Sequence, residues 1–258
     1  GAGEGVVFAD LDVIAIGPAV SEVSRQFDRY WNSASAYPAA KLLAPPPNDG
    51  AARLQARFAE NRVVPASVAY GEALKLTPLL RDLLEQKLVF EWSNVQLVAD
   101  DPAKTLDTQA RTDILLFPDL VRKIGLPTSS LDLVSPYFVP GEEGTAALAS
   151  LSRNGVRIRI LTNSLAASDV SAVHAGYAKR RKDLLRAGVE LFELKPTAGA
   201  GDDDRSGLGS SSSSGLHAKT FAVDQTRVFV GSFNFDPRSA RLNTEMGLVI
   251  DSPKLARE

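Results

Sequence analysis

The sequence of 258 residues contains no cysteine, which excludes a disulfide framework and a thiolate metal site. It has only two histidines and a single methionine, so each histidine is a conspicuous candidate for chemistry. No apolar run is long enough to cross a bilayer. The 44% content of hydrophobic residues still suffices for a packed core in one large domain or two small ones.

A strong excess of charge of one sign is also absent, because the formal net charge is -2. This balance argues against a broad electrostatic footprint for nucleic acid, so we expect no nucleic-acid partner. A local basic groove remains compatible with it. Residues 179–182 form a short basic run that suits either a solvated helix face or contact with anionic lipid headgroups, and we favour the second.

The most informative stretch is residues 216–246, which reads LHAKTFAVDQTRVFVGSFNFDPRSARLNTEM. His217 and Lys219 stand two apart in an alternating run, which predicts a strand with both side chains on one face. Asp224 ends this run as a turn residue. We expect Asp224 to hold the turn and not to touch substrate.

Small hydrogen-bonding side chains follow a second strand that is predicted to begin at residues 227–230. Lys219, Ser232 and Asn234 supply the cation and the neutral donors that a phosphodiester oxygen needs. His217 beside them is suited to attack phosphorus or to protonate a leaving oxygen, because imidazole exchanges a proton near neutral pH. The stretch therefore predicts a phosphate site that needs neither a metal nor an organic cofactor.

The spacing H-x-K-x4-D-x6-G-S-x-N resembles the signature of the phospholipase D superfamily at every fixed position. Three further stretches are similar to bacterial cardiolipin synthases of that superfamily: SPYFVPGE at 135–142, GVRIRILTNSLAASD at 155–169 and VHAGYAKRRKDLLRAGVELFEL at 173–194. The resemblance implies a phosphohistidine intermediate, with a carboxylate, Glu245, orienting the catalytic histidine. It implies a catalytic set of His217, Lys219, Asp224 and Glu245, and a phosphate-binding set of Lys219, Ser232 and Asn234.

The middle of the chain predicts an α/β fold. Buried strands alternate with helices in two successive strand-helix-strand units, which are typical of parallel sheet. The predicted strands are residues 131–138, 156–161 and 189–194, and the predicted helices are residues 145–153 and about 170–187. The resemblance implies an α/β/α sandwich with a mixed, largely parallel sheet, as the second half of a pseudo-two-fold bilobal enzyme.

The first residues repeat a pattern found near the far end. Residues 6–16 alternate like a half-buried strand, and a helix follows to about Trp31. Superposing the prolines of residues 8–18 and 243–253 places Asp10 opposite Glu245, which indicates an internal repeat. We therefore expect residues 1–33 to be the last strand and helix of a first phospholipase D-like domain, whose own histidine motif precedes Gly1.

In this interpretation residues 34–89 are a connector and helical insert, and residues 90–258 are a second phospholipase D-like domain. The isolated chain then lacks half of its active site and is expected to be inactive alone. Its partner is either the missing N-terminal half of a parent protein or a second copy, since a symmetric dimer would bring two copies of His217 together.

The resemblance implies a phosphatidyltransferase, similar to cardiolipin synthase, that acts on phosphatidylglycerol-like phospholipids at the periphery of a bacterial cytoplasmic membrane. A phosphodiesterase or nuclease of the same superfamily is the first alternative. A phosphate-binding module without turnover is the second.

Two other features receive structural interpretations. His174 shares a helical stripe with Val170, Val173 and Tyr177, which favours a packing role. Residues 199–215 are rich in glycine, serine and aspartate, and we expect a mobile flap before His217.

Overall fold

The structure, a computed structural model, describes residues 8–107, 109, 111–168, 170–195 and 215–258. Contacts divide the chain into two units, one of Gly1–Ala36 with Ser93–Glu258 and one of Tyr37–Trp92. The assignment of residues 1–33, 34–89 and 90–258 to parts of a longer parent stays a prediction. The predicted flap at residues 199–215 lies, except for Gly215, outside the described residues.

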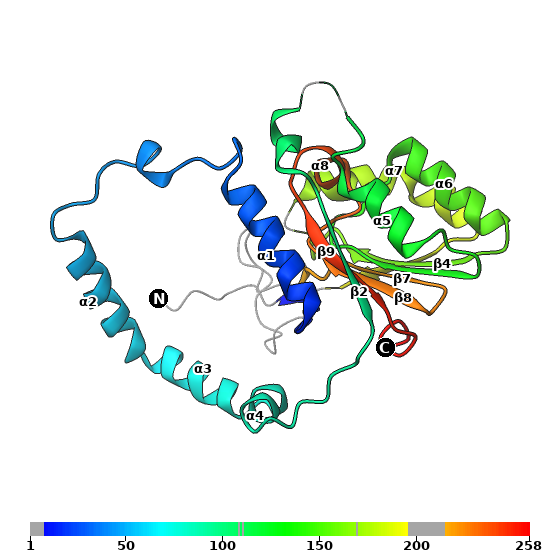
Figure 1. Cartoon of the computed structure of the whole chain (residues 1–258). Coiled ribbons are helices and arrows are strands. Elements are labelled where there is room, and N and C mark those ends of the chain that lie inside the picture. Colours follow the sequence, from blue (N-terminus) through cyan, green and yellow to red (C-terminus); the bar gives the residue numbers. More distant parts are fainter. Residues whose placement is uncertain (1–7, 108, 110, 169, 196–214) are drawn as a thin grey trace, which may run out of the picture. The chain divides into compact units, whose positions relative to one another are not determined.

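A seven-stranded mixed sheet organises the first unit (Figure 1). The strands are β2 (Asn94–Ala99), β3 (Ser130–Val134), β4 (Arg157–Asn163), β5 (Glu190–Leu194), β7 (Thr220–Val223), β8 (Arg227–Gly231) and β9 (Met246–Asp251). Their order across the sheet is β2-β9-β8-β7-β3-β4-β5.

The sheet is mixed, as predicted, but the expectation of a largely parallel sheet was wrong. Between the described strands of this seven-stranded sheet, β3–β4 and β4–β5 pair in parallel, whereas the other four pairs are antiparallel. The link between β7 and β8, residues 224–226, allows only an antiparallel pair, because parallel strands need a crossover of about a dozen residues or more.

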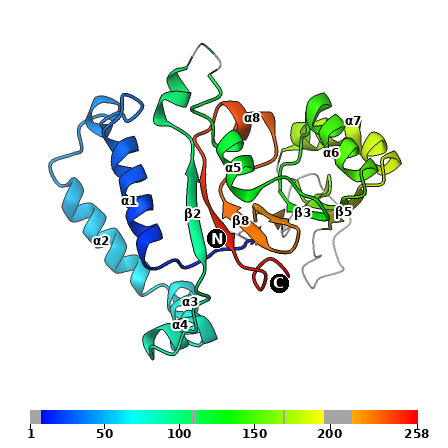
Figure 2. The ribbon, with the colours of Figure 1, turned by 45° about the vertical axis from the view of Figure 1, so that its right-hand side comes forward.

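Three helices cover one face of the sheet: α5 (Leu116–Ile124), α6 (Gly141–Arg153) and α7 (Ser171–Arg186). Helices α6 and α7 lie side by side and connect β3 to β4 and β4 to β5, which confirms both predicted strand-helix-strand units (Figure 2). A fourth helix, α1 (Pro18–Trp31), contacts β2 and packs Val23 against the apolar cluster on the opposite face.

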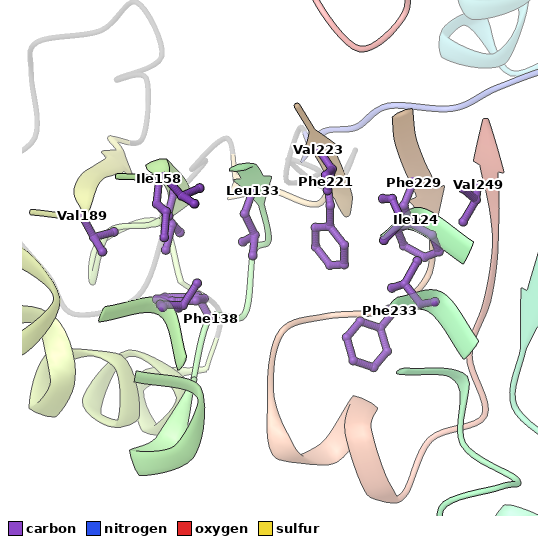
Figure 3. Close-up of a cluster of buried hydrophobic side chains, with 14 of the residues drawn as sticks. Ile124, Leu133, Phe138, Ile158, Val189, Phe221, Val223, Phe229, Phe233 and Val249 are labelled. Carbon is purple, nitrogen blue, oxygen red and sulfur yellow. The ribbon is translucent and has the colours of Figure 1, made fainter. Parts of the chain in front are cut away.

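The main core lies between the sheet and helices α5, α6 and α7 (Figure 3). Phe221 of β7 and Phe229 of β8 are paired across the strands, and their rings stack with centroids 5.2 Å apart. Gly231 at the end of β8 leaves room for this stack, since a Cβ atom there would lie 2.6 Å from Cζ of Phe229. The first residue of the G-S-x-N sequence is therefore glycine for reasons of space.

The predicted strand at residues 6–16 was mostly wrong. The structure contains a two-residue strand, β1 (Phe8–Ala9), which pairs in parallel with β6 (Gly215–Leu216). Residues 10–16 have no strand partner among the described residues, and their apolar side chains are 41 to 50% exposed, namely those of Leu11, Val13, Ile14 and Ile16. Apolar alternation thus predicted a strand for residues that pair with no other strand in the described part of the chain.

The second unit contains a 3-10 turn and three helices: η1 (Ala39–Lys41), α2 (Gly50–Arg62), α3 (Pro65–Lys75) and α4 (Pro78–Leu84). Helices α3 and α4 are separate, because Pro78 cannot continue α3 and begins α4. None of the side chains in these three helices is buried. Across the described part of the chain, no helix combines the length and the apolar character that spanning a membrane requires.

Candidate phosphodiester site

Backbone pairing holds the segment before His217 on both sides. On one side, the carbonyl oxygen of Ala9 accepts hydrogen bonds from the backbone N–H groups of His217 (2.8 Å) and Ala218 (3.2 Å). On the other, the side chain of Asn163 at the end of β4 donates to Leu216 O (3.1 Å) and accepts from Leu216 N (2.8 Å). These bonds fix the backbone at Leu216 and His217, directly at the predicted catalytic histidine.

This pairing brings Asp10 to the imidazole of His217. Asp10 Oδ2 lies 2.6 Å from His217 Nδ1, although the residues are 207 positions apart in sequence. Burial opposes ionisation of Asp10, but the hydrogen bond with His217 and the Leu11 N–H outweigh it and lower the pKa of the carboxyl. An ionised carboxylate at Nδ1 favours the tautomer that carries its proton on Nδ1.

Glu245 does not take the place that the sequence predicted for it. Its Oε2 accepts from Ser232 Oγ (2.5 Å) and its Oε1 from Ser239 Oγ (2.8 Å). The carboxylate at His217 Nδ1 is that of Asp10, whereas the sequence predicted Glu245 there. The internal repeat contained the missed signal, because it matched Asp10 with Glu245 as the two acidic residues of equivalent segments.

Lys219 is buried and, contrary to the prediction from the sequence, does not share a strand face with His217. Strand β7 begins only at Thr220, and Lys219 is 9% exposed, whereas the His217 side chain is 55% exposed. The ammonium group donates to the backbone oxygen of His217. Burial lowers the pKa of Lys219, while the charges of Asp10 and Glu245 act in the opposite direction. The ammonium is thus within electrostatic reach of both carboxylates.

The G-S-x-N turn lies next to Lys219, since the backbone N–H of Gly231 donates to Lys219 O (3.2 Å). Ser232 is exposed, and its hydroxyl oxygen accepts from Met246 N (3.1 Å). Asn234 is 9% exposed, and among the described residues its Oδ1 has no hydrogen-bond partner. The structure therefore brings together His217, Lys219, Ser232, Asn234 and Glu245, and adds Asp10.

Asp224 lies apart from this group, at the far end of β7. It stands five residues beyond Lys219, roughly 16 Å along an extended strand. Its carboxylate accepts from the backbone N–H groups and hydroxyls of Thr128 and Ser129 and from Ser130 N, at 2.7 to 3.0 Å. These contacts agree with a role in holding the turn, where Asp224 itself has a left-handed φ of 53°.

Replacing Asp224 with asparagine is expected to lower the free energy of unfolding at pH 7 by about 1–3 kcal/mol, because several donors lose a charged acceptor. Burial would raise the pKa of Asp224, but these hydrogen bonds lower it strongly. Since the folded pKa lies below the unfolded one, the stabilisation is present above about pH 4 and is lost as the pH falls further.

Urea unfolding of both proteins at pH 7 and pH 3 measures this effect. The difference between them should shrink at the lower pH. An equal difference at both pH values would contradict the role of the ionised carboxylate.

The remaining sequence candidates have packing or ion-pair partners. His174 packs edge to face on Tyr177, with ring centroids 5.6 Å apart, as its predicted packing role implies. In the basic run, Arg180 pairs with Glu142 (2.6 Å) and Arg181 with Glu193 (2.8 Å). The exposed cations of the run are therefore Lys179 and Lys182.

The fold is a mixed α/β domain, and its candidate site contains a histidine, a lysine and neutral hydrogen-bonding side chains. The family model described as "Cardiolipin synthase, PLD-like domain" matches residues 120–258, which is more than half of the chain. The chain belongs to this family of phospholipase D-like domains.

Similar proteins include cardiolipin synthase C of Escherichia coli (strain K12), which is 46% identical over 266 residues, covering 100% of this chain and 54% of that protein. Cardiolipin synthase A of Pseudomonas aeruginosa (strain PAO1) is 32% identical over 76% of this chain and 33% of its own length. The chain spans about half the length of the first of these relatives.

Among solved structures, phosphatidylserine synthase of Haemophilus influenzae Rd KW20 is similar over 92% of this chain and 49% of its own, with 18% identity and a TM-score of 0.48. The phospholipase D family member Nuc from Salmonella typhimurium is similar over 64% of this chain and 88% of its own, with 20% identity and a TM-score of 0.41.

Proposed function

We propose that the parent of this chain is a phosphatidyltransferase that moves a phosphatidyl group from one phospholipid to a hydroxyl of a second, such as phosphatidylglycerol, and so makes cardiolipin. The observation that carries the proposal is the Asp10–His217 pair beside the buried Lys219. Membership of the family and the 46% identity with a cardiolipin synthase support the choice of a phospholipid over another phosphodiester.

In the proposed reaction a histidine of the first motif, outside this chain, attacks phosphorus and forms a phosphohistidine. His217 gives its Nε2 proton to the departing glycerol oxygen as the phosphorus–oxygen bond breaks. In the second half, His217 takes the proton of the acceptor hydroxyl while that oxygen attacks phosphorus and the phosphorus–nitrogen bond breaks. Asp10 stabilises the protonated imidazole throughout, since its carboxylate lies at Nδ1.

Lys219, Ser232 and Asn234 are proposed to bind the non-bridging phosphate oxygens. These oxygens carry the negative charge that the transition state spreads, so a preorganised cation and amide stabilise it more than mobile water would. We place the parent at the periphery of a bacterial cytoplasmic membrane, where its substrates reside. We expect the isolated chain, with one histidine motif, to need the missing half or a second copy for turnover.

The test compares this chain with a version extended upstream through the first motif. Both are mixed with phosphatidylglycerol vesicles and a chelator, and cardiolipin and phosphatidic acid are measured. Cardiolipin from the extended protein alone is the expected result. Folded extended protein that makes neither product, yet cleaves a soluble phosphodiester or single-stranded DNA, would contradict phosphatidyl transfer and favour the diesterase.

A further inference from the structure

A buried ion pair lies next to the site but outside the histidine motif. Asp100 directly follows β2, and Lys104 lies in the 3-10 turn η2 (Pro102–Leu106). Lys104 Nζ and Asp100 Oδ2 are 2.8 Å apart, with side chains 2% and 0% exposed. Removing two charges from water is costly, and an apolar pair of the same volume would often stabilise a fold as well or better. The pair therefore calls for an explanation beyond stability.

The bonds of Asp100 point to the start of β9. Its Oδ2 accepts from Glu245 N (2.8 Å), and its backbone N–H donates to Glu245 O (2.9 Å). Its Oδ1 accepts from Leu116 N at the beginning of α5 (2.6 Å). Both peptide groups next to Glu245 are thus held by one residue that lies 145 positions earlier in the sequence.

The bonds of Lys104 point to α8 (Pro237–Arg241). Its ammonium group donates to Ser239 O (2.8 Å). Figures 1 and 2 both show α8 beside the end of β2, where this contact is made. Ser239 is fully buried, and its hydroxyl donates to Glu245 Oε1 while accepting from Asn234 N. The ion pair therefore holds two points, Ser239 and Glu245, of the segment that follows the proposed phosphate donors.

One further hydrogen bond connects these contacts of Asp100 and Lys104 to Ser232, which is proposed to bind phosphate. Glu245 Oε2 accepts from Ser232 Oγ, so the direction of the serine hydroxyl depends on where the carboxylate is held. Ser239 similarly fixes the position of the Asn234 backbone, because its hydroxyl oxygen accepts a hydrogen bond from Asn234 N. Neither Ser232 nor Asn234 lies in a helix or a strand, and turn residues keep a precise position only when they are bonded to rigid elements.

We propose that Asp100 and Lys104 are positioning residues of the phosphate site, which hold Glu245 and Ser239 and, through them, Ser232 and Asn234 in the geometry that receives a phosphate oxygen. The inference rests on the proposed function only in that the ligand is a phosphate group. The ion pair touches no substrate.

The test replaces Lys104 with methionine and measures two properties of the full chain. The first is the affinity for inorganic phosphate, expected to fall by at least about tenfold, because a displacement of about 1 Å in a site can cost far more than a lost contact. The second is amide exchange, expected to rise at Ser232, Asn234 and Glu245 while Val249 in the core stays protected.

Lys123→Met is a matched control. Lys123 also pairs with an aspartate four residues earlier, Asp119 (3.0 Å), and also donates to a backbone oxygen, that of Leu97 (2.7 Å). It belongs to α5 and not to the network, so its loss should leave phosphate affinity within about twofold. If Lys104→Met does not fold, the double variant Asp100→Asn/Lys104→Met removes both charges and leaves no lone buried ion.

The outcomes separate the two proposals. Uniformly faster exchange across the sheet, with phosphate affinity unchanged in the folded molecules, would assign the pair a general stabilising role and overturn the positioning proposal. Absence of phosphate binding in the unaltered chain would contradict the phosphate site itself and would overturn the positioning proposal with it, whereas phosphatidyl transfer by the extended protein tests the proposed function separately. Local loosening together with weaker binding, in either variant but not in the control, is the expected result.

Discussion

Replacing His217 with alanine in the full-length parent is expected to reduce phosphatidyl transfer by roughly 10²–10⁴-fold, the usual contribution of a positioned acid and base. Proton transfer to the glycerol oxygen has no other donor in the proposed mechanism. Cardiolipin formed from phosphatidylglycerol vesicles measures the loss. The effect should fall mainly on kcat, because Lys219 and Asn234 still bind the phosphate.

His174→Ala is the natural control, since it removes the only other histidine of the chain. His174 packs on Tyr177 and takes no part in the proposed steps, so that variant should keep most of its transfer activity. Equal activity of His217→Ala and the unaltered protein would rule out His217 as the proton carrier.

Asp10→Asn is expected to have the second largest effect, a reduction in transfer of about 10²-fold or more, because an amide no longer favours the proton on Nδ1 or stabilises the imidazolium. The isolated chain allows a direct measurement that needs no turnover. Nitrogen NMR of His217 should show the Nδ1-protonated form in the unaltered chain and a mixture of tautomers in the variant.

Two matched variants sharpen this measurement. Asp12→Asn changes an exposed carboxylate two residues further along the same segment and should leave the His217 tautomer unchanged. Glu245→Gln should likewise preserve the tautomer, although it disturbs Ser232 and Ser239. If the tautomer changes in Glu245→Gln and not in Asp10→Asn, the original prediction from the sequence is right and the contact in the structure is not the functional one.

Much of the fold was predictable because its signals are local. The pattern of buried strands separated by helices identified β3, β4 and β5 and the two helices between them. The G-S-x-N turn was placed correctly, since a glycine followed by short polar side chains interrupts a strand wherever it occurs. Asp224 was also recognised as a turn residue before its partners at Thr128 and Ser129 were known.

What could not be predicted depends on contacts between distant segments. Nothing in a strand-like pattern states which strand it joins, so residues 10–16 were assigned to a sheet that the described chain does not offer them. The choice between Asp10 and Glu245 as the partner of His217 has the same origin, because both are acidic residues in similar segments. The Asp100–Lys104 pair gave no signal, as an i, i+4 pair usually indicates an exposed helix face.

The short ladder between β1 and β6 has a consequence for how this region tolerates change in length. Ala9 and Leu216 are paired in this ladder, and Asp10 and His217 each follow directly after one of them. The two side chains meet because both lie the same number of residues beyond the last pair. A single insertion or deletion on either side would turn one of them to the opposite face, since side chains alternate along extended chain. A substitution of a side chain near Ala9 leaves the number of residues unchanged, so the spacing of this region constrains the Asp10–His217 contact more than its composition does.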